Sequence, residues 1–429
     1  TVLEDKMTYD EALNYIHSRP RLKNADGHAG MRKLMDYLGN PQDDLRYIHV
    51  AGTNGKGSCA AMCANVLTTA GYKTGLNISP FVIDFTERFS INGKYIPNDT
   101  LAEITEKVKF YREKIEKENG LIILEFEIVT AIAFYWFAAE KCDIVCLEVG
   151  IGGLMDSTNI IKTSLVSCIM NISYDHQNIL GDTLEEIAYQ KAGIIKPGQD
   201  VICYPAQDKF ALDVIKRVAA EKNATLIVPN KNDIIHINEG FMQTKLIYEN
   251  FEIHQSFTGL HQSYNASVVI EAMKAVRKYG FNITDDNIVK GIENTKFPAR
   301  IEVISQDPLI ILDGGHNTDG VSALTAVLKE NNIKNLTAVW RTLSDKQPEK
   351  IIEMIAPYVK TLYTVTLEGN KRALTARQLA EMAKGKIETV YVAHSTKEAV
   401  ELAKENISAG LLVFGSLYLA SEARGLLLK

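Results

Sequence analysis

The amino-acid sequence predicts an α/β fold: a P-loop-type, mostly parallel sheet domain with a small antiparallel side sheet, followed by a C-terminal Rossmann-like α/β domain. Three observations predict it. Apolar strand-like runs alternate with helical patterns along nearly the whole chain of 429 residues, which is typical of βαβ units and a parallel sheet. A glycine-rich turn connects an early buried run to a helix. A second series of alternating strand-like and helical patterns begins near residue 300.

The glycine-rich turn has the composition of a phosphate-binding loop. It reads Gly52-Thr53-Asn54-Gly55-Lys56-Gly57-Ser58 and lies between an apolar strand and a helix of small residues over 59–70. Glycines let backbone N–H groups converge on an anion, and the helix N-terminus and Lys56 add positive charge. The usual loop has a glycine where Val50 stands and a hydroxyl directly after the lysine, whereas here Gly57 precedes Ser58. A surface turn without a ligand is the alternative interpretation.

The first domain is predicted from alternating buried strands and helices. The strands are expected at Tyr47–Ala51, Ile144–Val149, Ser164–Ile169, Val201–Cys203 and Thr225–Val228. The helices are expected at Thr100–Lys117, Glu127–Lys141, Leu184–Ile195 and Asp208–Lys222. Residues 234–257 alternate in polarity around two turns, which predicts the antiparallel side sheet. A helix is expected again over 263–279.

The domain boundary is predicted at Lys296-Phe297-Pro298-Ala299-Arg300, which gives domains over residues 1–296 and 297–429. After it come alternating strand and helix patterns, enough for a compact second domain. They are Ile301–Ile304, Leu309–Leu312, Ala323–Glu330, Thr337–Val339, Ile351–Tyr358, Thr361–Val365, Arg377–Ala383, Glu388–Val392, Lys397–Lys404 and Leu411–Phe414.

Composition restricts the class of protein. A net charge of −6 argues against nucleic-acid binding, which needs a basic face. The six cysteines include no C-x-x-C pair, as expected in a reducing cytoplasm. No apolar run approaches the roughly 20 residues that span a bilayer, and the polar start Thr1–Lys6 does not resemble a signal peptide. We therefore expect a cytoplasmic enzyme without nucleic-acid or membrane partners.

Several polar residues follow buried strands, where ligands bind in open α/β sheets. Glu148 precedes the glycine turn at residues 150–153, and a carboxylate beside a phosphate loop suits Mg²⁺ better than a merely solvated strand end. Asp156 and the pair Asp175-His176 follow, although a single histidine is as often structural. Lys191 lies near a helix end, where favouring the helix dipole is the simpler interpretation.

Two motifs of the second domain are also candidates. Arg300 lies at the predicted boundary, where a guanidinium could bind phosphate bidentately or form an interdomain ion pair. Asp313-Gly314-Gly315-His316-Asn317 follows a buried strand. It is interpreted as a second substrate-binding edge, with a structural turn as the alternative.

Taken together, these motifs resemble the folylpolyglutamate synthase family within the wider Mur ligase group of ATP-dependent amide-forming enzymes. The blocks that carry the resemblance are Gly52–Ser58; Ser79-Pro80-Phe81; Glu148–Gly153; Asp175-His176 with Lys191–Lys196; and Asp313–Asn317. Further support comes from His261-Gln262 with Asn265, from Phe297–Arg300, and from Gly415-Ser416-Leu417-Tyr418. The ordered set is far more specific than any one block.

The resemblance implies a role for each matching position. Residues Gly52, Thr53, Asn54, Gly55, Lys56, Gly57 and Ser58 would bind the ATP phosphates. Asn265 and Arg300 would also contact the nucleotide, and Asp313 would contact the ribose or belong to the domain-closing network. Ser79 and Glu148 would bind one Mg²⁺ and His176 a second, with Ser58 and a carbamylated Lys191 as further ligands. Substrate contacts would come from Ser79, Pro80, Phe81, Asp156, His316 and Ser416. Catalysis would depend on Lys56, Lys191, Asp313 and His316.

The implied reaction is the ATP-dependent addition of L-glutamate to the γ-carboxylate of a reduced folate through an acyl phosphate, by a monomer. Dihydrofolate synthase activity on dihydropteroate is the nearest alternative. A peptidoglycan-type Mur ligase and a nucleotide-dependent switch protein are more distant ones. Two places depart from the family pattern. Leu154 replaces an arginine or acidic residue, and Trp340–Lys346 replaces a small glycine-containing loop.

Overall fold

The computed structural model describes residues 6–21, 28–370 and 372–428, and it divides the chain into two units. Unit 1 comprises Thr1–Asp233 and Tyr264–Thr295, and unit 2 comprises Ile234–Ser263 and Lys296–Lys429. The break at Lys296 coincides with the predicted boundary to within one residue. Residues 234–263, however, belong to unit 2 and not to the first domain in which the sequence analysis placed them.

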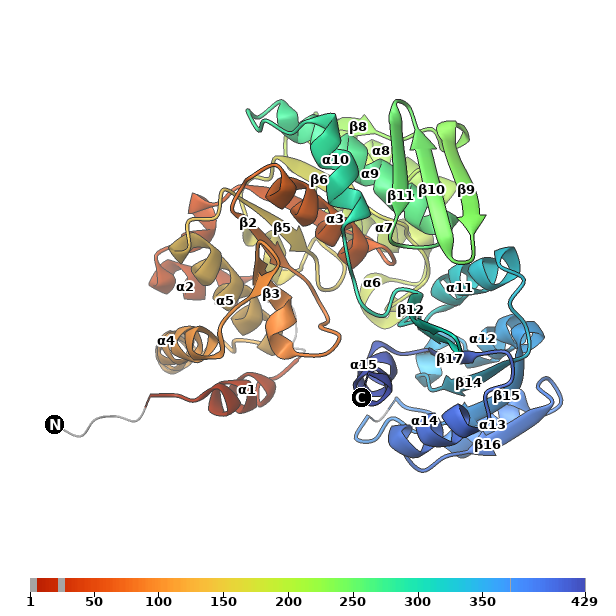
Figure 1. Cartoon of the computed structure of the whole chain (residues 1–429). Helices are drawn as coiled ribbons and strands as arrows, with labels where there is room; N and C mark the ends of the chain where they lie inside the picture. Colours follow the sequence, from red (N-terminus) through yellow and green to blue (C-terminus); the bar gives the residue numbers. More distant parts are fainter. Residues whose placement is uncertain (1–5, 22–27, 371, 429) are drawn as a thin grey trace. The chain divides into compact units, whose positions relative to one another are not determined.

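Unit 1 is built on an eight-stranded sheet with the order β4-β3-β2-β5-β1-β6-β7-β8 (Figure 1). All neighbours pair in parallel except β3, which is antiparallel to both β2 and β4. Its strands are β1 (Tyr47–Ala51), β2 (Thr74–Asn77), β3 (Phe89–Ile91), β4 (Lys94–Tyr95), β5 (Ile144–Glu148), β6 (Val166–Ile169), β7 (Asp200–Cys203) and β8 (Thr225–Ile227). The sequence analysis did not predict β2, β3 and β4, because short segments with glycine, asparagine and charged residues lack a clear apolar run.

The helices associated with unit 1 flank this sheet. They are α1 (Tyr9–His17), α2 (Ala29–Leu38), α3 (Lys56–Thr69), α4 (Asn98–Asn119), α5 (Glu125–Ala139), α6 (Gln177–Leu180), α7 (Leu184–Ala192), α8 (Lys209–Glu221), α9 (Leu260–Arg277) and α10 (Asp285–Glu293). Most residues of α3 are small and buried, so this helix packs closely against β1, β2 and β5. A Cβ atom at Gly291 of α10 would lie 2.5 Å from Val66 Cα. This close packing fixes α3, which carries the phosphate loop at its N-terminus.

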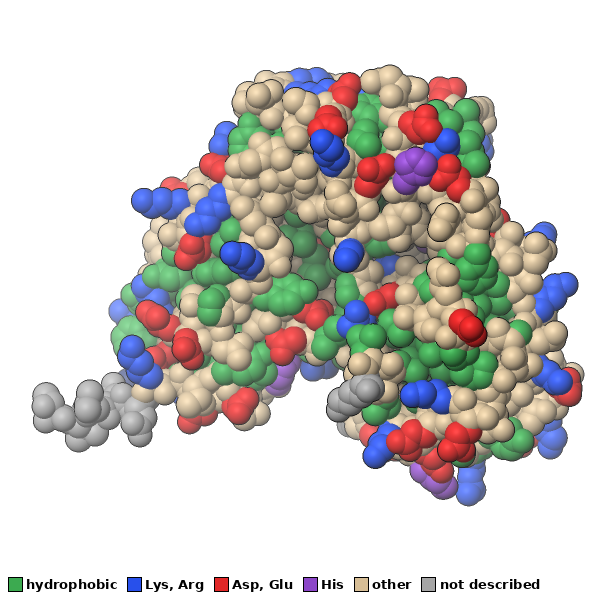
Figure 2. Space-filling view, viewed as in Figure 1, with side chains coloured by type: hydrophobic (Ala, Val, Ile, Leu, Met, Phe, Trp, Pro, Cys, Tyr) green, Lys and Arg blue, Asp and Glu red, His purple; other side chains and the backbone are tan. Residues whose placement is uncertain are grey.

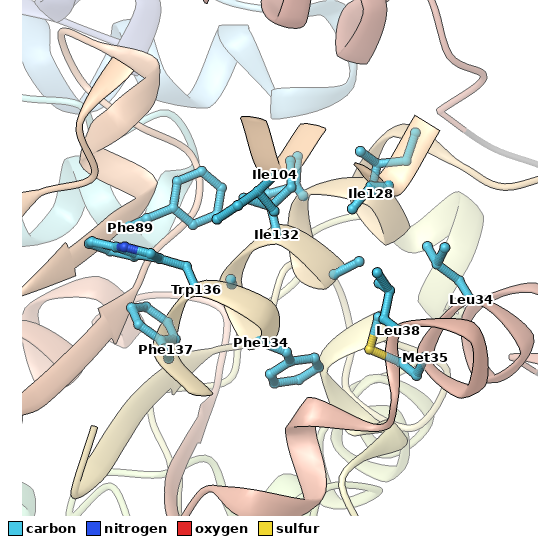
Figure 3. Packing of buried hydrophobic residues seen from close by; sticks show 14 of the residues in the cluster. Leu34, Met35, Leu38, Phe89, Ile104, Ile128, Ile132, Phe134, Trp136 and Phe137 are labelled. Atoms are coloured by element: carbon cyan, nitrogen blue, oxygen red, sulfur yellow. The ribbon is translucent and has the colours of Figure 1, made fainter. Parts of the chain in front are cut away.

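A large hydrophobic core lies between the sheet of unit 1 and helices α2, α4 and α5. Figure 3 shows Phe134, Trp136 and Phe137 of α5 grouped with Phe89 of β3 and with residues of α2. Each large aromatic side chain removed from water contributes a few kcal/mol, at about 25 cal/mol per Å². This core therefore holds the parallel strands rigidly, so that the loops at their carboxyl ends have defined positions.

Unit 2 contains a six-stranded sheet with the order β12-β13-β17-β14-β15-β16, parallel except for β12. Its strands are β12 (Glu302–Gln306), β13 (Leu309–Leu312), β14 (Leu336–Trp340), β15 (Val359–Thr364), β16 (Thr389–Val392) and β17 (Leu411–Phe414). Its helices are α11 (Thr318–Glu330), α12 (Pro348–Ile355), α13 (Ala376–Ala383), α14 (Thr396–Glu405) and α15 (Leu417–Leu427). The predicted α/β fold class is thereby confirmed.

A three-stranded antiparallel sheet, the predicted side sheet, also belongs to unit 2. It consists of β9 (Ile234–Gly240), β10 (Gln243–Tyr248) and β11 (Phe251–Gln255). The backbone N–H of Met242 donates to Asn331 Oδ1 over 2.8 Å, and His236 Nε2 lies 2.9 Å from Glu330 Oε1. These contacts with α11 and the residue after it explain why the side sheet groups with the second unit.

On the face shown in Figure 2, acidic (red) and basic (blue) side chains are interspersed. Across the part of the chain that the structure describes, no helix is both long enough and apolar enough to traverse a bilayer.

Candidate active site

The phosphate loop of unit 1 connects the carboxyl end of β1 to α3, as the sequence predicts. Gly52 has φ +150° and Gly55 has φ +87°, and Gly55 is the N-cap of α3, whose first residue is Lys56. A Cβ atom at Gly52 would lie only 2.6 Å from Met170 Cβ. Glycine is therefore required at both positions. The loop lies at the N-terminus of α3, where the helix dipole has its positive end.

A turn after β6 anchors the phosphate loop. The backbone N–H of Thr53 donates to the Asn171 carbonyl over 2.7 Å, and Thr53 Oγ1 donates to the Ser173 carbonyl over 3.0 Å. The Asn265 amide lies beside the loop, because a Cβ atom at Gly55 would be 2.7 Å from Asn265 Oδ1. The structure thus brings Asn265 to the loop with which the sequence analysis grouped it.

Two lysines point at carbonyl oxygens of this loop. Lys56 Nζ donates to the Thr53 carbonyl over 3.2 Å, and Lys191 Nζ donates to the Gly52 carbonyl over 2.9 Å. Lys191 is only 4% exposed. Burial and then the positive charge of Lys56 lower the pKa of Lys191 to about 7, against the opposing effect of Asp175 and Asp156. Lys191 lies in the last turn of α7, as the helix-dipole interpretation expects, and its buried amine is also directed at the Gly52 carbonyl of the loop.

Glu148 and Ser79 are also brought together. Glu148 ends β5 and is 4% exposed, and its Oε2 accepts a hydrogen bond of 2.8 Å from the Ser79 backbone N–H. β2 and β5 are parallel neighbours, which places the segment after β2 beside the end of β5. Ser58 is buried in the first turn of α3. Carboxylate and hydroxyl oxygens are ligands that Mg²⁺ accepts, together with water and phosphate oxygens.

His176 and Asp175 lie in the loop between β6 and α6. His176 has a left-handed backbone with φ +51°. Its N–H donates to Asp175 Oδ1 over 2.7 Å, and its Nε2 lies 3.9 Å from the same oxygen. Within residues 6–21, 28–370 and 372–428, no three or more His, Cys, Asp or Glu side chains form a group that could hold a metal. A cation here would need serine, modified lysine or ATP oxygens as well.

Asp156 holds the glycine turn that follows β5. Its Oδ2 accepts from the Ile151 N–H over 2.9 Å, and its Oδ1 accepts from the Thr158 N–H and Oγ1 over 3.0 and 2.6 Å. Burial raises the pKa of Asp156, and these hydrogen bonds act against that rise. The geometry gives Asp156 a part in positioning the turn, and its contact with substrate stays a prediction.

His49 of β1 contacts Thr158, which is hydrogen-bonded to Asp156. Its titration can be used to test this buried hydrogen-bond network. Its Nε2 lies 2.9 Å from Thr158 Oγ1, and the ring is fully buried. Burial, assisted by the charge of Lys196, lowers the pKa of His49 to about 3. When the pH falls below about 6.5, the pKa of histidine in the unfolded chain, His49 is protonated in the unfolded chain but stays neutral in the folded chain. Stability should therefore fall with decreasing pH by about 1.4 kcal/mol per pH unit from this group alone.

We expect the His49→Gln variant to lose that share of the pH dependence, since a neutral amide can donate to Thr158 without titrating. The measurement is the urea midpoint of unfolding at several values between about pH 7 and pH 5. His261, whose pKa burial lowers to about 4, remains in the variant and accounts for part of the remaining slope. An unchanged slope in the variant would mean that His49 is not held neutral.

The segment after β2 is held by a carboxylate. Glu87 accepts hydrogen bonds from the backbone N–H groups of Val82, Ile83 and Asp84 over 2.8 to 3.2 Å. The guanidinium of Arg88 lies 5.2 Å from the ring centre of Phe81. Phe81, which the sequence analysis assigned to the substrate together with Pro80, therefore belongs to an ordered loop beside Glu148.

Unit 2 has a polar cluster of its own at the carboxyl end of β13. Asp313 Oδ1 accepts from the Ile301 N–H, and Oδ2 accepts from the Gly315 N–H, both over 3.1 Å. Burial raises the pKa of Asp313, and the charge of Arg300 is the largest opposing influence. A Cβ atom at Gly314 would lie 2.9 Å from Arg300 Nη1. The segment that carries Arg300 and the segment that carries Asp313 are therefore in direct contact.

Two further predicted residues flank this cluster. His316 Nδ1 lies 3.2 Å from the Gly314 carbonyl oxygen. Ser416 is the N-cap of α15 and follows β17, which is the parallel neighbour of β13. The predicted residues therefore form two clusters, one in each unit. Their roles remain predictions.

The backbone around Arg300 is strained. Ala299 has φ +55° and Ile301 has φ +51°, so both neighbours of the arginine are left-handed. For residues other than glycine this conformation costs about 1–2 kcal/mol, and it is particularly unusual for a β-branched side chain. Such residues persist only where the surroundings hold them.

The segment 340–346, where the sequence analysis expects a departure from the family pattern, packs within unit 2. Arg341 is buried, and its Nη1 and Nη2 lie 3.2 and 2.9 Å from the two carboxylate oxygens of Glu422 on α15. The Trp340 ring stacks on Phe414 with centroids 6.1 Å apart. The large ring of Trp340 and the charge of Arg341 thus both have partners within unit 2.

The sequence analysis missed several residues that shape these clusters. Asn171 and Ser173 hold the phosphate loop, Glu87 orders the segment after β2, and Arg424 of α15 binds Glu302 beside Arg300. None belongs to a glycine-rich motif. Each acts through a contact with another segment of the chain, and the local sequence around the residue does not indicate that contact.

The fold and the two clusters define a nucleotide-dependent enzyme with a phosphate loop in one α/β unit and a polar strand-end cluster in the other. Comparison with known families gives its class. Residues 50–273 match the Mur ligase middle domain, and residues 299–417 match the Mur ligase glutamate ligase domain.

Individual relatives resemble the whole chain. The folylpolyglutamate synthase of Lacticaseibacillus casei is 34% identical, over 98% of this chain and 99% of that protein. The dihydrofolate synthase/folylpolyglutamate synthase of Bacillus subtilis (strain 168) is 33% identical, over 97% and 98%. Among solved structures, Mycobacterium tuberculosis folylpolyglutamate synthase complexed with ADP and AMPPCP matches with a TM-score of 0.88, 26% identity and 98% coverage of both chains. A folylpolyglutamate synthase–AMPPCP–folate complex matches with a TM-score of 0.82, 31% identity and coverage of 99% and 100%.

The chain belongs to the Mur ligase family, in its folylpolyglutamate synthase and dihydrofolate synthase branch. It is an ATP-dependent ligase.

Proposed function

We propose that this ligase joins the amine of L-glutamate to the γ-carboxylate of a reduced folate, with conversion of ATP to ADP and phosphate. The observation that supports it most is the phosphate loop, where Lys56 and Lys191 approach the loop carbonyls at the N-terminus of α3. The names of the relatives give the acceptor and the amino acid, and the folate complex of one relative agrees with them.

The chemistry requires activation of a carboxylate. The folate γ-carboxylate attacks the γ-phosphorus of ATP, and ADP leaves, which gives an acyl phosphate. The amine of glutamate then attacks the acyl carbonyl, phosphate leaves, and the amine proton is lost to the medium. Lys56 and the N–H groups of the loop neutralise charge in the phosphoryl transfer. Positioning and exclusion of water are the larger tasks of the protein.

The residues of unit 1 suit divalent cations. Mg²⁺, when bound, neutralises phosphate charge and orients ATP. Glu148, Ser79 and Ser58 would supply oxygen atoms for one ion, and His176 and a carbamylated Lys191 would supply ligands for a second. Carbamylation of Lys191 is supported by its burial, because burial lowers the pKa of the amine and so favours the neutral form that can be carbamylated. The added carboxylate would turn this amine into an anionic ligand.

The other residues divide between nucleotide and substrates. Asn265, Arg300 and Asp313 would contact the nucleotide, and His316 and Ser416 would lie near the incoming glutamate. Pro80 and Phe81 would contact the folate, and Asp156 would contact a substrate. Asn265 has the most direct support, because its amide lies against Gly55 of the phosphate loop.

Addition of glutamate to dihydropteroate is a second candidate activity. A relative of nearly equal identity carries both activities in its name, and both reactions follow the same acyl-phosphate route.

The test is Mg²⁺-dependent ADP release in the presence of glutamate, with methylene-tetrahydrofolate, tetrahydrofolate, dihydropteroate or no acceptor. We expect release that requires a folate, with a product heavier by one glutamyl unit. Release with dihydropteroate would add the second activity. Release that is indifferent to every acceptor would contradict the ligase reaction with these substrates.

We also propose that the enzyme works as a monomer in the cytoplasm. All six cysteines are free and buried, which suits a reducing compartment. Light scattering of the purified protein tests the first statement, and fractionation of cells that produce it tests the second.

A further inference from the structure

The turn that carries Arg300 is held at three backbone groups. The Ala299 N–H donates to Glu302 Oε2 over 2.9 Å, and the Gly314 N–H donates to the Ala299 carbonyl over 2.9 Å. The Ile301 N–H donates to Asp313 Oδ1 over 3.1 Å. These three backbone groups of the two left-handed residues, Ala299 and Ile301, are therefore held by hydrogen bonds to other residues of unit 2.

Glu302 is itself held by α15. Arg424 Nε donates to Glu302 Oε1 over 3.0 Å and to Oε2 over 3.1 Å, and Arg424 Nη2 lies 3.0 Å from Oε1. The Glu302 and Arg424 side chains are 20% and 22% exposed. These contacts with both carboxylate oxygens orient Glu302, whose Oε2 also accepts from the Ala299 N–H.

The Arg300 guanidinium is confined by the same turn. Its Nη1 donates to the Ala299 carbonyl over 3.2 Å, and its centre lies 5.3 Å from the Phe297 ring centroid. It also passes beside Gly314, where a Cβ atom would be 2.9 Å from Nη1. If Ala299 or Ile301 left the left-handed region, the Ala299 carbonyl would turn and the guanidinium would lose its place.

We propose that Glu302 and Arg424 form a clamp that keeps the turn at residues 299–301 in its strained conformation and thereby positions Arg300 for the anionic phosphates of the nucleotide. This inference rests on the proposed role of Arg300. Glu302 and Arg424 are positioning residues, because they act through the backbone of the turn. The sequence distance of 122 residues between them explains why no local motif indicates the pair.

The first experiment measures nucleotide binding and kinetics of the full chain with Arg424→Gln. We expect the Kd of AMPPCP by calorimetry and the KM for ATP to rise about fivefold to tenfold, with kcat within about twofold, because the arginine is displaced in most of the unliganded molecules. The control Lys386→Gln removes the same charge from another ion pair of unit 2, Lys386 with Glu353 at 3.1 Å. It should leave both constants unchanged.

The second experiment tests the strain directly. Glycine adopts the left-handed region without the steric cost that alanine has, so Ala299→Gly removes one reason for the turn to leave its conformation. We expect Arg424→Gln with Ala299→Gly to recover at least half of the lost AMPPCP affinity on a logarithmic scale. A merely structural ion pair would lower the urea midpoint of Arg424→Gln and leave nucleotide affinity unchanged, and no rescue by glycine would occur.

Failure of the clamp and failure of the proposed role of Arg300 give different results. If Arg300→Ala weakens AMPPCP binding while Arg424→Gln does not, the clamp is overturned and the role of Arg300 stands. If Arg300→Ala leaves AMPPCP binding unchanged, Arg300 does not contact the nucleotide and the clamp has no function there. Weakening by both variants with rescue by Ala299→Gly supports the proposal, and weakening without rescue overturns it.

Discussion

Replacing Lys56 by alanine is expected to lower kcat/KM for ligation by about 10³-fold or more while the protein stays folded. Lys56 is the first residue of α3 and donates to the Thr53 carbonyl. We propose that its ammonium is the charge that the loop offers to the transferred phosphoryl group. Alanine is a good helix former at this position, so the helix itself should not suffer. The measurement is initial velocity of ADP release against ATP and folate concentration.

The control for this variant is Lys162→Ala, which removes an exposed lysine of the same unit that pairs with Asp43. An exposed ion pair contributes little to stability, and we expect normal ligation from this control. Thermal unfolding of both variants should stay within a few degrees of the parent. Near-normal turnover by folded Lys56→Ala would contradict the assignment of the loop.

Replacing Lys191 by alanine is expected to lower ligation by about 10²-fold or more, and short carboxylic acids such as formate or acetate should restore part of it. The variant removes a buried side chain that contacts the Gly52 carbonyl, and with it the proposed carbamate. A small carboxylate can occupy the resulting space and supply the missing oxygen ligands. The measurement is ADP release over a titration of each acid.

Two comparisons keep this expectation specific. The Lys56→Ala variant should gain nothing from the same acids, because its missing group is a cation. Parent enzyme loaded with carbon-13-labelled bicarbonate should give a carbamate signal in carbon-13 NMR that Lys191→Ala lacks. Full activity of Lys191→Ala without added acid would leave the lysine with a structural role only.

The sequence by itself determined the fold class, the family and the identity of the motifs. Strand β1 and the loop that follows it were predicted at their observed residues, because an unbroken apolar run and a glycine–lysine turn are local signals. The position of Glu148 at a strand end followed from the same alternation of apolar runs and helices. The small strands β2, β3 and β4 did not, since their pairing partners and not their own composition make them strands.

Only the tertiary structure decided which motifs meet and what holds them. The contact of Lys191 with Gly52 spans 139 residues, and that of Ser79 with Glu148 spans 69. The grouping of the side sheet with unit 2 depends on contacts near the end of α11, and the strained turn at Arg300 depends on Glu302, Arg424 and Asp313. The physical reason is the same in each case. Hydrogen bonds and burial act between atoms that the folded sheet brings together, whereas local sequence records only the preferences of neighbours along the chain.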